Sequence, residues 1–191
     1  KDRVRKQLRR FEVVGSGDIF IEEELIELRN HSGLEFTPEQ RRQILERRFA
    51  YRGGRMRVLR IGVLGFLPPQ TVDWEPELKA EMQVEDILTA ARSGIADLRQ
   101  QGAELILALS HSGIGELDPV PMMENASTAL AALPGIDLIV AGHSHRVFPA
   151  PDHPAGPGID VARGTLAGKP AVMPGFWGSH LGIIDLELEP V

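Results

Sequence analysis

The sequence contains no cysteine among its 191 residues. This absence excludes disulfides, thiolate metal ligands and a cysteine nucleophile, so a bound metal must be held by His, Asp, Glu, Asn or backbone oxygen. Aromatic residues make up only 5% of the chain. No apolar run approaches the ~18 residues that a membrane-spanning helix requires. No signal-peptide pattern occurs at the start, which is Lys1 rather than Met.

Two short catalytic motifs are also missing. There is no G-x-S-x-G sequence, so the serines are not placed in the turn that an α/β-hydrolase nucleophile occupies. Gly15-Ser16-Gly17-Asp18 has neither the spacing nor the lysine of a phosphate-binding loop. Nucleophilic serine chemistry and P-loop nucleotide binding are therefore not expected.

The composition is that of an ordinary soluble globular protein, with 42% apolar and 25% charged residues. The length predicts one domain, or one domain with an appendage. Charge is unevenly distributed, because residues 1–57 carry 14 Lys and Arg against 10 Asp and Glu, and the rest carry 7 against 17. The basic residues are interspersed with acids and the remaining chain is acidic, so we expect no nucleic-acid polymer as a partner.

The first third of the chain has two interpretations. Residues 1–34 contain two short helical patterns separated by Gly15 and Gly17. Residues 37–50 begin with Thr-Pro and a glutamine at the third helical position, which is typical of a helix start. The stretch from Ile44 to Phe66 also contains two extended runs around Gly53-Gly54, which is typical of a hairpin.

From residue 58 the pattern alternates between strand and helix. Strands are predicted at 58–66, 104–111 and 137–145, with helices at 84–102 and 122–133 between them. This β-α-β-α-β order predicts parallel strands joined by right-handed crossovers. Residues 147–170 are predicted to be loop, and residues 169–190 are predicted to form two antiparallel strands around Gly175 and Gly178.

Two of these strands carry the same local pattern and end in histidine. The segments are GAELILALSH at 102–111 and GIDLIVAGH at 135–143. In open α/β sheets, ligands bind beyond the carboxyl ends of the strands, so we expect His111, His143 and His145 to converge there. Side chains two apart in extended backbone point the same way, and imidazole suits Zn, Mn, Fe and Ni alike. The three histidines are therefore predicted metal ligands.

Other polar residues receive structural interpretations. His31 and His153 lie in polar loops, and His180 lies in a turn before a predicted strand. Arg146 is either a surface residue or a bidentate phosphate ligand. Glu124 and Asn125 are interpreted as residues of the first turn of the second helix, with a contact to a metal ligand as the alternative.

Several longer stretches carry a family resemblance. They are RIGVLGFLPPQTVDW, ALSHSGIG, MENAS, GIDLIVAGHSHRVFP and GTLAGKPAVMPGFWGSHLGIIDLELE. Together they resemble the metallophosphoesterases of the 5′-nucleotidase family, and most of all its 2′,3′-cyclic-nucleotide 2′-phosphodiesterase/3′-nucleotidase branch. The resemblance runs from about Ile44 to Glu189. It implies an α/β class fold, an α/β/β/α sandwich incomplete at the amino terminus, with a hairpin rather than a helix at 44–63.

The resemblance also implies a site for two divalent metal ions, zinc, manganese or similar. By motif, His111 and His143 would hold one metal and His145 the other. The family's Asp-x-His, Gly-Asp and Gly-Asn-His-Glu motifs are not recognisable before residue 44. Asp18 and His31 occur in the right order but are too close together, and whether either replaces a missing ligand is open. We therefore expect residues 1–43 to be an atypical segment and residues 44–191 to be a partial catalytic domain.

These expectations define a function and one alternative. The resemblance implies metal-dependent hydrolysis of nucleotide phosphoesters, with turnover by this chain weak or absent because the amino-terminal ligands are not identifiable. The alternative is a non-catalytic metal- or nucleotide-binding domain of the same fold. The expected partner is a small nucleotide substrate, with no membrane, in a periplasmic or extracellular location. Catalytic and substrate-binding residues, metal identity, base preference and oligomeric state are not predicted.

Overall fold

The structure is a computed structural model that describes residues 42–51, 55–74 and 83–188. The chain divides into two compact units. One unit, Thr37–Gly182, contains every described helix and strand. The other comprises Lys1–Phe36 and Ile183–Val191, of which residues 183–188 are described and contain neither helix nor strand. The predicted helices at 1–34, together with Asp18 and His31, lie outside the described residues, and the boundary predicted at residue 43 stays a prediction.

A long hairpin opens the described chain. Strand β1 (Arg42–Tyr51) pairs antiparallel with β2 (Arg55–Phe66), in a register that runs from Arg42 opposite Leu64 to Tyr51 opposite Arg55. The hairpin prediction is therefore confirmed, and the helix predicted from Thr-Pro at 37–38 does not form over residues 42–50. Local helix signals are a weak preference, and pairing along ten residues outweighs them.

Helix α5 (Ile87–Gln100) confirms the helix predicted at 84–102. It begins after Asp86, whose Oδ1 accepts a hydrogen bond from the Thr89 backbone N–H at 3.0 Å. Oδ2 of the same carboxylate accepts from the Met122 N–H at 2.9 Å. Partial burial raises the pKa of Asp86, but these backbone hydrogen bonds favour its charged form and hold the pKa below its ordinary value. Asp86 thus starts the helix and ties it to the loop that contains Met122.

The parallel core of the sheet follows the predicted order. Strand β3 (Leu105–Ser110) is parallel to β2, and β4 (Leu138–Ala141) is parallel to β3. The helix between β3 and β4, α6, spans only Ser127–Ala131, so the prediction of a helix over 122–133 was too long. The N–H groups of Ala126 and Ser127 bond to Ser112 Oγ and Gly113 O, and residues 122–125 are therefore held as loop.

The rest of the sheet is built from short strands. They are β5 (Val147–Phe148), β6 (Ile159–Asp160), β7 (Thr165–Leu166) and β8 (Lys169–Pro174). Strand β8 runs parallel to β4 and antiparallel to β5 and β7. The predicted second strand of 169–190 was wrong, because residues 179–188 form no strand. The pairing positions of β8 are taken by β4, β5 and β7 instead.

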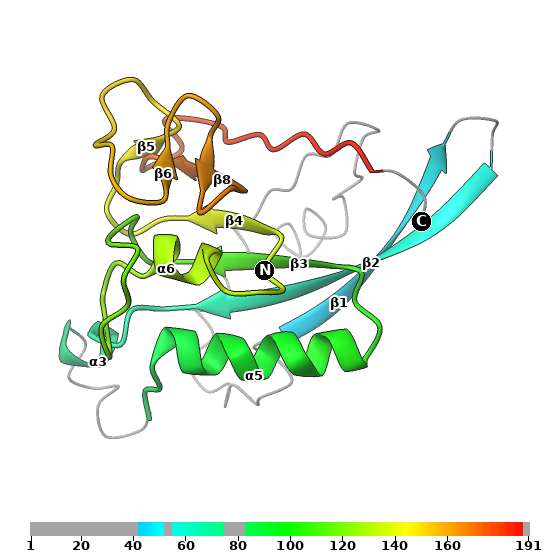
Figure 1. Ribbon diagram of the computed structural model, residues 1–191, viewed down its shortest axis with the longest axis horizontal. Coiled ribbons are helices and arrows are strands. Elements are labelled where there is room, and N and C mark those ends of the chain that lie inside the picture. The colour runs from blue at the N-terminus through cyan, green and yellow to red at the C-terminus, as the bar shows by residue number, and fades with distance from the viewer. Residues whose placement is uncertain (1–41, 52–54, 75–82, 189–191) are drawn as a thin grey trace, which may run out of the picture. The chain divides into compact units, whose positions relative to one another are not determined.

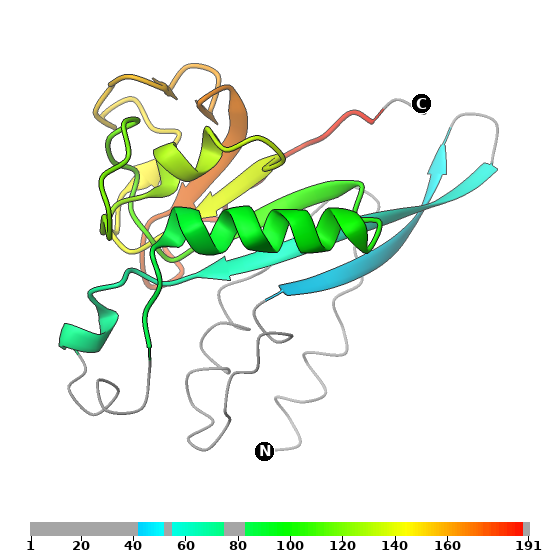
Figure 2. The ribbon, with the colours of Figure 1, turned by 60° about the horizontal axis from the view of Figure 1, so that its bottom comes forward.

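Helices α5 and α6 cover the same face of the sheet and contact each other (Figures 1 and 2). Their apolar side chains meet those of β2, β3 and β4 in one core, which includes Leu64, Leu98, Ile106, Leu130 and Ile139. The mixed sheet with a helical layer confirms the α/β class. Within the described ranges, no helix has the length and apolar character needed to cross a membrane.

Candidate functional site

Three neighbouring parallel strands end at the same level of the sheet. In the register, Ser110 at the end of β3 pairs with Phe66 of β2 on one side and with Ala141 of β4 on the other. Strand β8 lies parallel to β4 on its far side. The segments that leave these strands therefore emerge along one edge, where an open α/β sheet places its ligand site.

This edge brings two of the predicted ligands together. The ring centres of His111 and His143 lie 5.6 Å apart. Trp74, the last residue of the short helix α3 (Thr71–Trp74) after β2, stacks on His143 at 5.1 Å. The exposed ring of His145 stacks on Phe176, which follows β8, at 5.3 Å. The convergence of His111 with His143 is as predicted, whereas aromatic residues flanking the histidines were not predicted.

The backbone of the paired histidines differs from the predicted extended form. His143 has φ of 68° and His145 has φ of 58°, both in the left-handed region. The chain turns directly after β4, because the Gly142 N–H bonds to Ser112 O and the Ser144 N–H bonds to Gly142 O. The prediction that both side chains project from extended backbone was therefore wrong. A left-handed non-glycine residue has a backbone cost, and such residues are enriched at functional sites.

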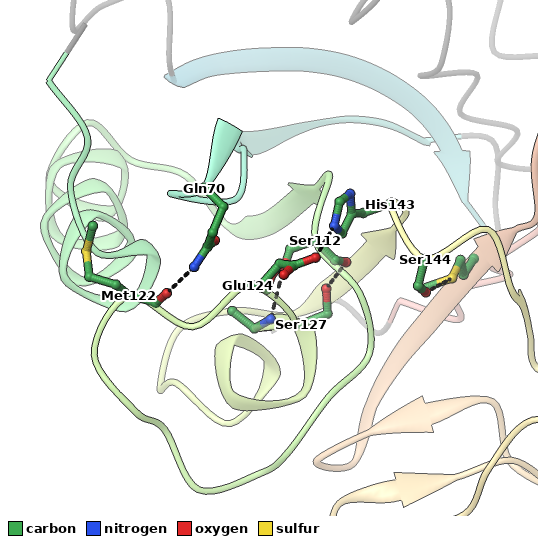
Figure 3. A network of polar contacts seen from close by, with 9 residues as sticks. Gln70, Ser112, Met122, Glu124, Ser127, His143 and Ser144 are labelled. Carbon is green, nitrogen blue, oxygen red and sulfur yellow. Dashed lines mark hydrogen bonds and ion pairs between the residues drawn. The ribbon is translucent and has the colours of Figure 1, made fainter. Parts of the chain in front are cut away.

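His143 has a carboxylate partner. Its Nε2 lies 2.7 Å from Glu124 Oε1 (Figure 3). Because an ionised carboxylate only accepts hydrogen bonds, the N–H of Nε2 is the donor, and in the tautomer with its one proton on Nε2 the lone pair lies on Nδ1. Glu124 lies before α6 rather than in its first turn, so helical backbone geometry does not constrain the direction of its side chain. A carboxylate that fixes a histidine in this way is typical of metal sites.

Buried serines hold the loop that presents Glu124. Ser112 Oγ donates to Glu124 O at 2.5 Å and accepts from the Ala126 N–H at 2.7 Å. Ser127 Oγ donates to Ser112 O at 2.7 Å (Figure 3). Both serines are fully buried. These bonds fix the backbone on both sides of Asn125 and so keep the Glu124 carboxylate opposite His143.

The donor chemistry suits a divalent transition metal, but the described residues do not complete a site. Imidazole and carboxylate are the ligands expected for zinc or manganese in a chain without cysteine. Over residues 42–51, 55–74 and 83–188, no three His, Asp or Glu side chains are arranged to hold a metal ion. The described residues bring His111 and His143 together, and their role as metal ligands stays a prediction.

A pocket of about 460 Å³ lies beside the histidines. Its lining residues come from four segments: Ile114–Glu116, Asn125, Ser144 with Arg146, and His153–Pro157 with Ile159. His153 was interpreted as a residue of a polar loop, but it is only 8% exposed and its ring packs edge-on against Phe148 at 5.0 Å. His180 is exposed, and its Nδ1 contacts Ser179 Oγ at 2.9 Å.

Comparisons with known proteins agree with the fold. The chain is 45% identical over 138 residues to the 2′,3′-cyclic-nucleotide 2′-phosphodiesterase/3′-nucleotidase of Yersinia enterocolitica, and 43% identical over 136 residues to that of Salmonella typhimurium. It superimposes on the crystal structure of the calcineurin-like phosphoesterase YfkN from Bacillus subtilis with a TM-score of 0.67 and 35% identity. In sequence and fold, this chain is similar to the calcineurin-like phosphoesterases. No family model matches it.

The relationship has a defined extent. The matches cover 72% and 71% of this chain but only 21% of each nucleotidase, and 42% of the YfkN chain. The chain thus spans about a fifth of the length of the curated phosphoesterases it matches. These relatives are hydrolases, and the nucleotidases among them act on nucleotides, as their names state. The recognised resemblance and the phosphoesterase fold are confirmed, whereas the roles of the individual histidines stay predictions.

Proposed function

We propose that this chain forms part of a site for metal-dependent hydrolysis of nucleotide phosphoesters, of the 2′,3′-cyclic phosphodiesterase and 3′-nucleotidase type. The observation that supports this function is the meeting of His111 and His143, with Glu124, at the carboxyl edge of parallel strands. That arrangement occurs in a chain related to nucleotide phosphoesterases. His111 and His143 are the proposed ligands of one divalent ion, and His145 of a second.

The neighbouring residues position these ligands. A bound divalent ion would supply a Lewis acid for phosphoryl oxygen and lower the pKa of bound water. Glu124 accepts a hydrogen bond from the Nε2–H of His143, and in this tautomer Nδ1 is the nitrogen with the lone pair for a metal. Trp74, stacked on the same ring, restricts its rotation and covers it from water. The phosphate of the substrate would lie at this edge of the sheet.

The second candidate function is a non-catalytic metal- or nucleotide-binding domain. It is favoured by the finding that the described part of the chain assembles no group of three metal-binding side chains. Under the first proposal, turnover by this chain alone is slow but measurable, and it is faster if carboxylates outside the described residues complete the site. Location in the periplasm or outside the cell is part of the same proposal, and cell fractionation tests it.

Metal binding and turnover, measured separately, decide between the two functions. Titration calorimetry with Zn²⁺ and Mn²⁺ is expected to show binding that His143→Ala weakens at least tenfold. Glu124→Ala is expected to weaken it 10- to 100-fold, because the His143 ring loses the acceptor that orients it. The matched control is His180→Ala, an exposed histidine outside the site. Equal binding by wild type and His143→Ala would overturn the metal proposal.

Hydrolysis of 2′,3′-cyclic AMP and 3′-AMP, with added metal, is the second measurement. Slow turnover that His143→Ala abolishes and His180→Ala preserves supports the catalytic proposal. Metal binding without any turnover above the buffer rate overturns the catalytic proposal for this chain and supports the binding domain instead.

A further inference from the structure

The ring of His143 is contacted by two different segments of the chain. Glu124, in the loop before α6, lies 2.7 Å from its Nε2. Trp74, the last residue of α3, stacks on its face at 5.1 Å, with an angle of 19° between the two ring planes. The hydrogen bond restricts the direction of Nε2, and the stacking restricts the tilt of the ring. A displacement of one segment relative to the other would therefore reorient the imidazole.

The two segments are joined at the backbone of Met122. Its carbonyl oxygen accepts a hydrogen bond from Gln70 Nε2 at 2.8 Å (Figure 3). Its N–H donates to Asp86 Oδ2 at 2.9 Å. Met122 has φ of 58°, in the left-handed region, and these two hydrogen bonds help to offset the cost of that backbone conformation. Glu124 follows two residues later, so this Met122 joint, formed by Gln70, Met122 and Asp86, fixes the start of the loop that presents it.

Gln70 also anchors the segment that contains Trp74. The Trp74 N–H donates to Gln70 O at 3.2 Å, within the single turn of α3. The main chain of Gln70 thus holds Trp74, and its side chain holds Met122. A helix of four residues is too short to be stable by itself, so the position of the Trp74 ring depends on tertiary contacts of this kind.

The side chain of Gln70 is expected to add little to the stability of the fold. Its Oε1 is buried and has no hydrogen-bond partner among the described residues. A buried acceptor without a partner costs about as much free energy as one hydrogen bond contributes. Replacing the whole amide by an apolar group should therefore change stability only slightly, while it releases Met122 from α3.

We infer that Gln70 is a positioning residue for His143. By joining α3 to the Met122 loop, it keeps Trp74 and Glu124 in place on the same imidazole ring. That this positioning prepares His143 for a metal ion rests on the proposed function, whereas the positioning itself does not. Gln70 acts only through the residues that it holds and takes no part in the chemical step.

The ring protons of the histidines, observed by NMR in the presence of EDTA, test the positioning without metal or substrate. A tryptophan ring shifts the signals of protons stacked on its face upfield, so His143 should give upfield signals that Trp74→Leu abolishes. Gln70→Met keeps the length of the side chain and removes the donor, and it should reduce this upfield shift by about half or more. The matched control Gln101→Met, at an exposed position, should leave it unchanged.

Two other histidines serve as internal references. His145 and His153 pack against phenylalanine rings rather than tryptophan, so their signals should not move in Gln70→Met. The melting temperature of this variant should fall by less than about 3 °C. His143 signals that keep their wild-type shift would overturn the inference. A large fall in melting temperature with changes in every histidine signal would also overturn it, because Gln70 would then have a structural role.

A second variant breaks the Met122 joint from its other side. Asparagine is as good as aspartate at the start of a helix, so Asp86→Asn can still accept from the Thr89 N–H. Its NH2 group, in place of Oδ2, cannot accept from the Met122 N–H. We expect the His143 signals to move in the same direction as in Gln70→Met. Should Gln70→Met fail to fold, Asp86→Asn decides alone, and unmoved His143 signals overturn the inference.

Metal affinity separates failure of the positioning from failure of the proposed function. Under the proposed function, Gln70→Met should weaken Zn²⁺ and Mn²⁺ binding about 3- to 10-fold, which is less than Glu124→Ala, because Glu124 contacts the ring directly. Moved ring signals in a chain that binds no metal overturn the function and support the positioning. Unmoved ring signals, together with metal binding that His143→Ala weakens, overturn the positioning and support the function.

Discussion

Strands β3 and β4 begin with the same set of contacts. At the start of β3, the Glu104 carboxylate accepts from the Arg60 N–H at 3.1 Å and from Arg57 at 2.6 Å. At the start of β4, the Asp137 carboxylate accepts from the Ile106 N–H at 2.7 Å and from an arginine of α5 at 2.7 Å. In both cases an acidic residue binds the backbone of the preceding strand and one arginine. The repeated acid therefore fixes the register of each strand against its neighbour.

The two strands end differently. After β3, the His111 N–H continues the ladder by donating to Phe66 O at 2.9 Å. After β4, the chain turns at Gly142 and His143 takes φ of 68°. The acidic residue at the start of β3 and of β4 therefore aligns the ends of the two strands. The turn after β4, which β3 lacks, then places His143 beside His111. In the repeated segments 102–111 and 135–143, the acidic residue thus determines the strand register, and the residues at the end of the strand determine the site geometry.

The largest expected effect is the difference in the free energy of unfolding between variants that lack the side chain of Asp137 and variants that lack that of Glu104. Ile106 is fully buried, so Asp137→Ala leaves its N–H unpaired and should lower the free energy of unfolding by about 2–4 kcal/mol. Glu104→Ala should cost less than about 1 kcal/mol, because the residues that it binds are partly exposed and can bond to water. Urea denaturation measures both. Asp137→Asn keeps an acceptor for the Ile106 N–H, so its free energy of unfolding should fall about half as much as that of Asp137→Ala. Equal losses of stability in Asp137→Ala and Glu104→Ala would contradict the comparison of the two strands.

A smaller effect should distinguish the glycines that follow the two strands. A Cβ on Gly115, in the loop after β3, would overlap the backbone oxygen of Asn125. Gly115→Ala should therefore cost about 1–3 kcal/mol. A Cβ on Gly142, after β4, meets nothing closer than His111 Nδ1 at 3.7 Å. Gly142→Ala should be neutral or stabilising by less than about 1 kcal/mol. Melting temperatures of the two variants give the answer, and a lower value for Gly142→Ala would show that the β4 turn is the tighter one.

The smallest effect concerns the pH dependence of Glu104. The hydrogen bond from the Arg60 backbone, together with the hydrogen bond and charge of Arg57, holds the pKa of Glu104 below its ordinary value against the opposing effect of burial. A carboxyl whose pKa is lowered by folding stabilises the protein above its unfolded pKa, and this contribution disappears as the pH falls through the folded value. Glu104→Gln should therefore cost less than about 1 kcal/mol at pH 7 and nothing in strong acid. Urea denaturation of Glu104→Gln and wild type at both pH values measures this loss of stability. A larger loss in acid than at pH 7 would contradict the direction expected from the lowered pKa.

The elements that were predicted correctly are those whose local sequence pattern is sufficient to specify them. Helix α5 follows from its 3.6-residue apolar period, and the parallel order of β2, β3 and β4 follows from the alternation of strands and helices. Residues 42–50 could not be decided locally, because a helix start and a strand pattern coincide and only pairing with β2 selects the strand. Residues 179–188 alternate like a strand, but alternation does not show whether a neighbouring edge is available.

The candidate site was predictable only in part. The convergence of His111 and His143 follows from parallel strands that end at one edge. The contact of Glu124 with His143 depends on a loop held by the buried Ser112 and Ser127, and no local pattern signals such a long-range network. His153 has Asp152 and Pro154 as neighbours, which favours a surface loop, and only the packing against Phe148 buries it.

The left-handed backbone at His143 and His145 means that selection for stability and selection for activity favour different residues at these two positions. Glycine accepts positive φ without strain, so His143→Gly and His145→Gly relieve a backbone cost that imidazole cannot avoid. A library of variants screened for heat resistance alone would therefore accumulate glycine at these two positions, and under the proposed function a library screened for phosphoester hydrolysis would retain histidine. The proposal thus opposes stability and chemistry within the three residues from His143 to His145.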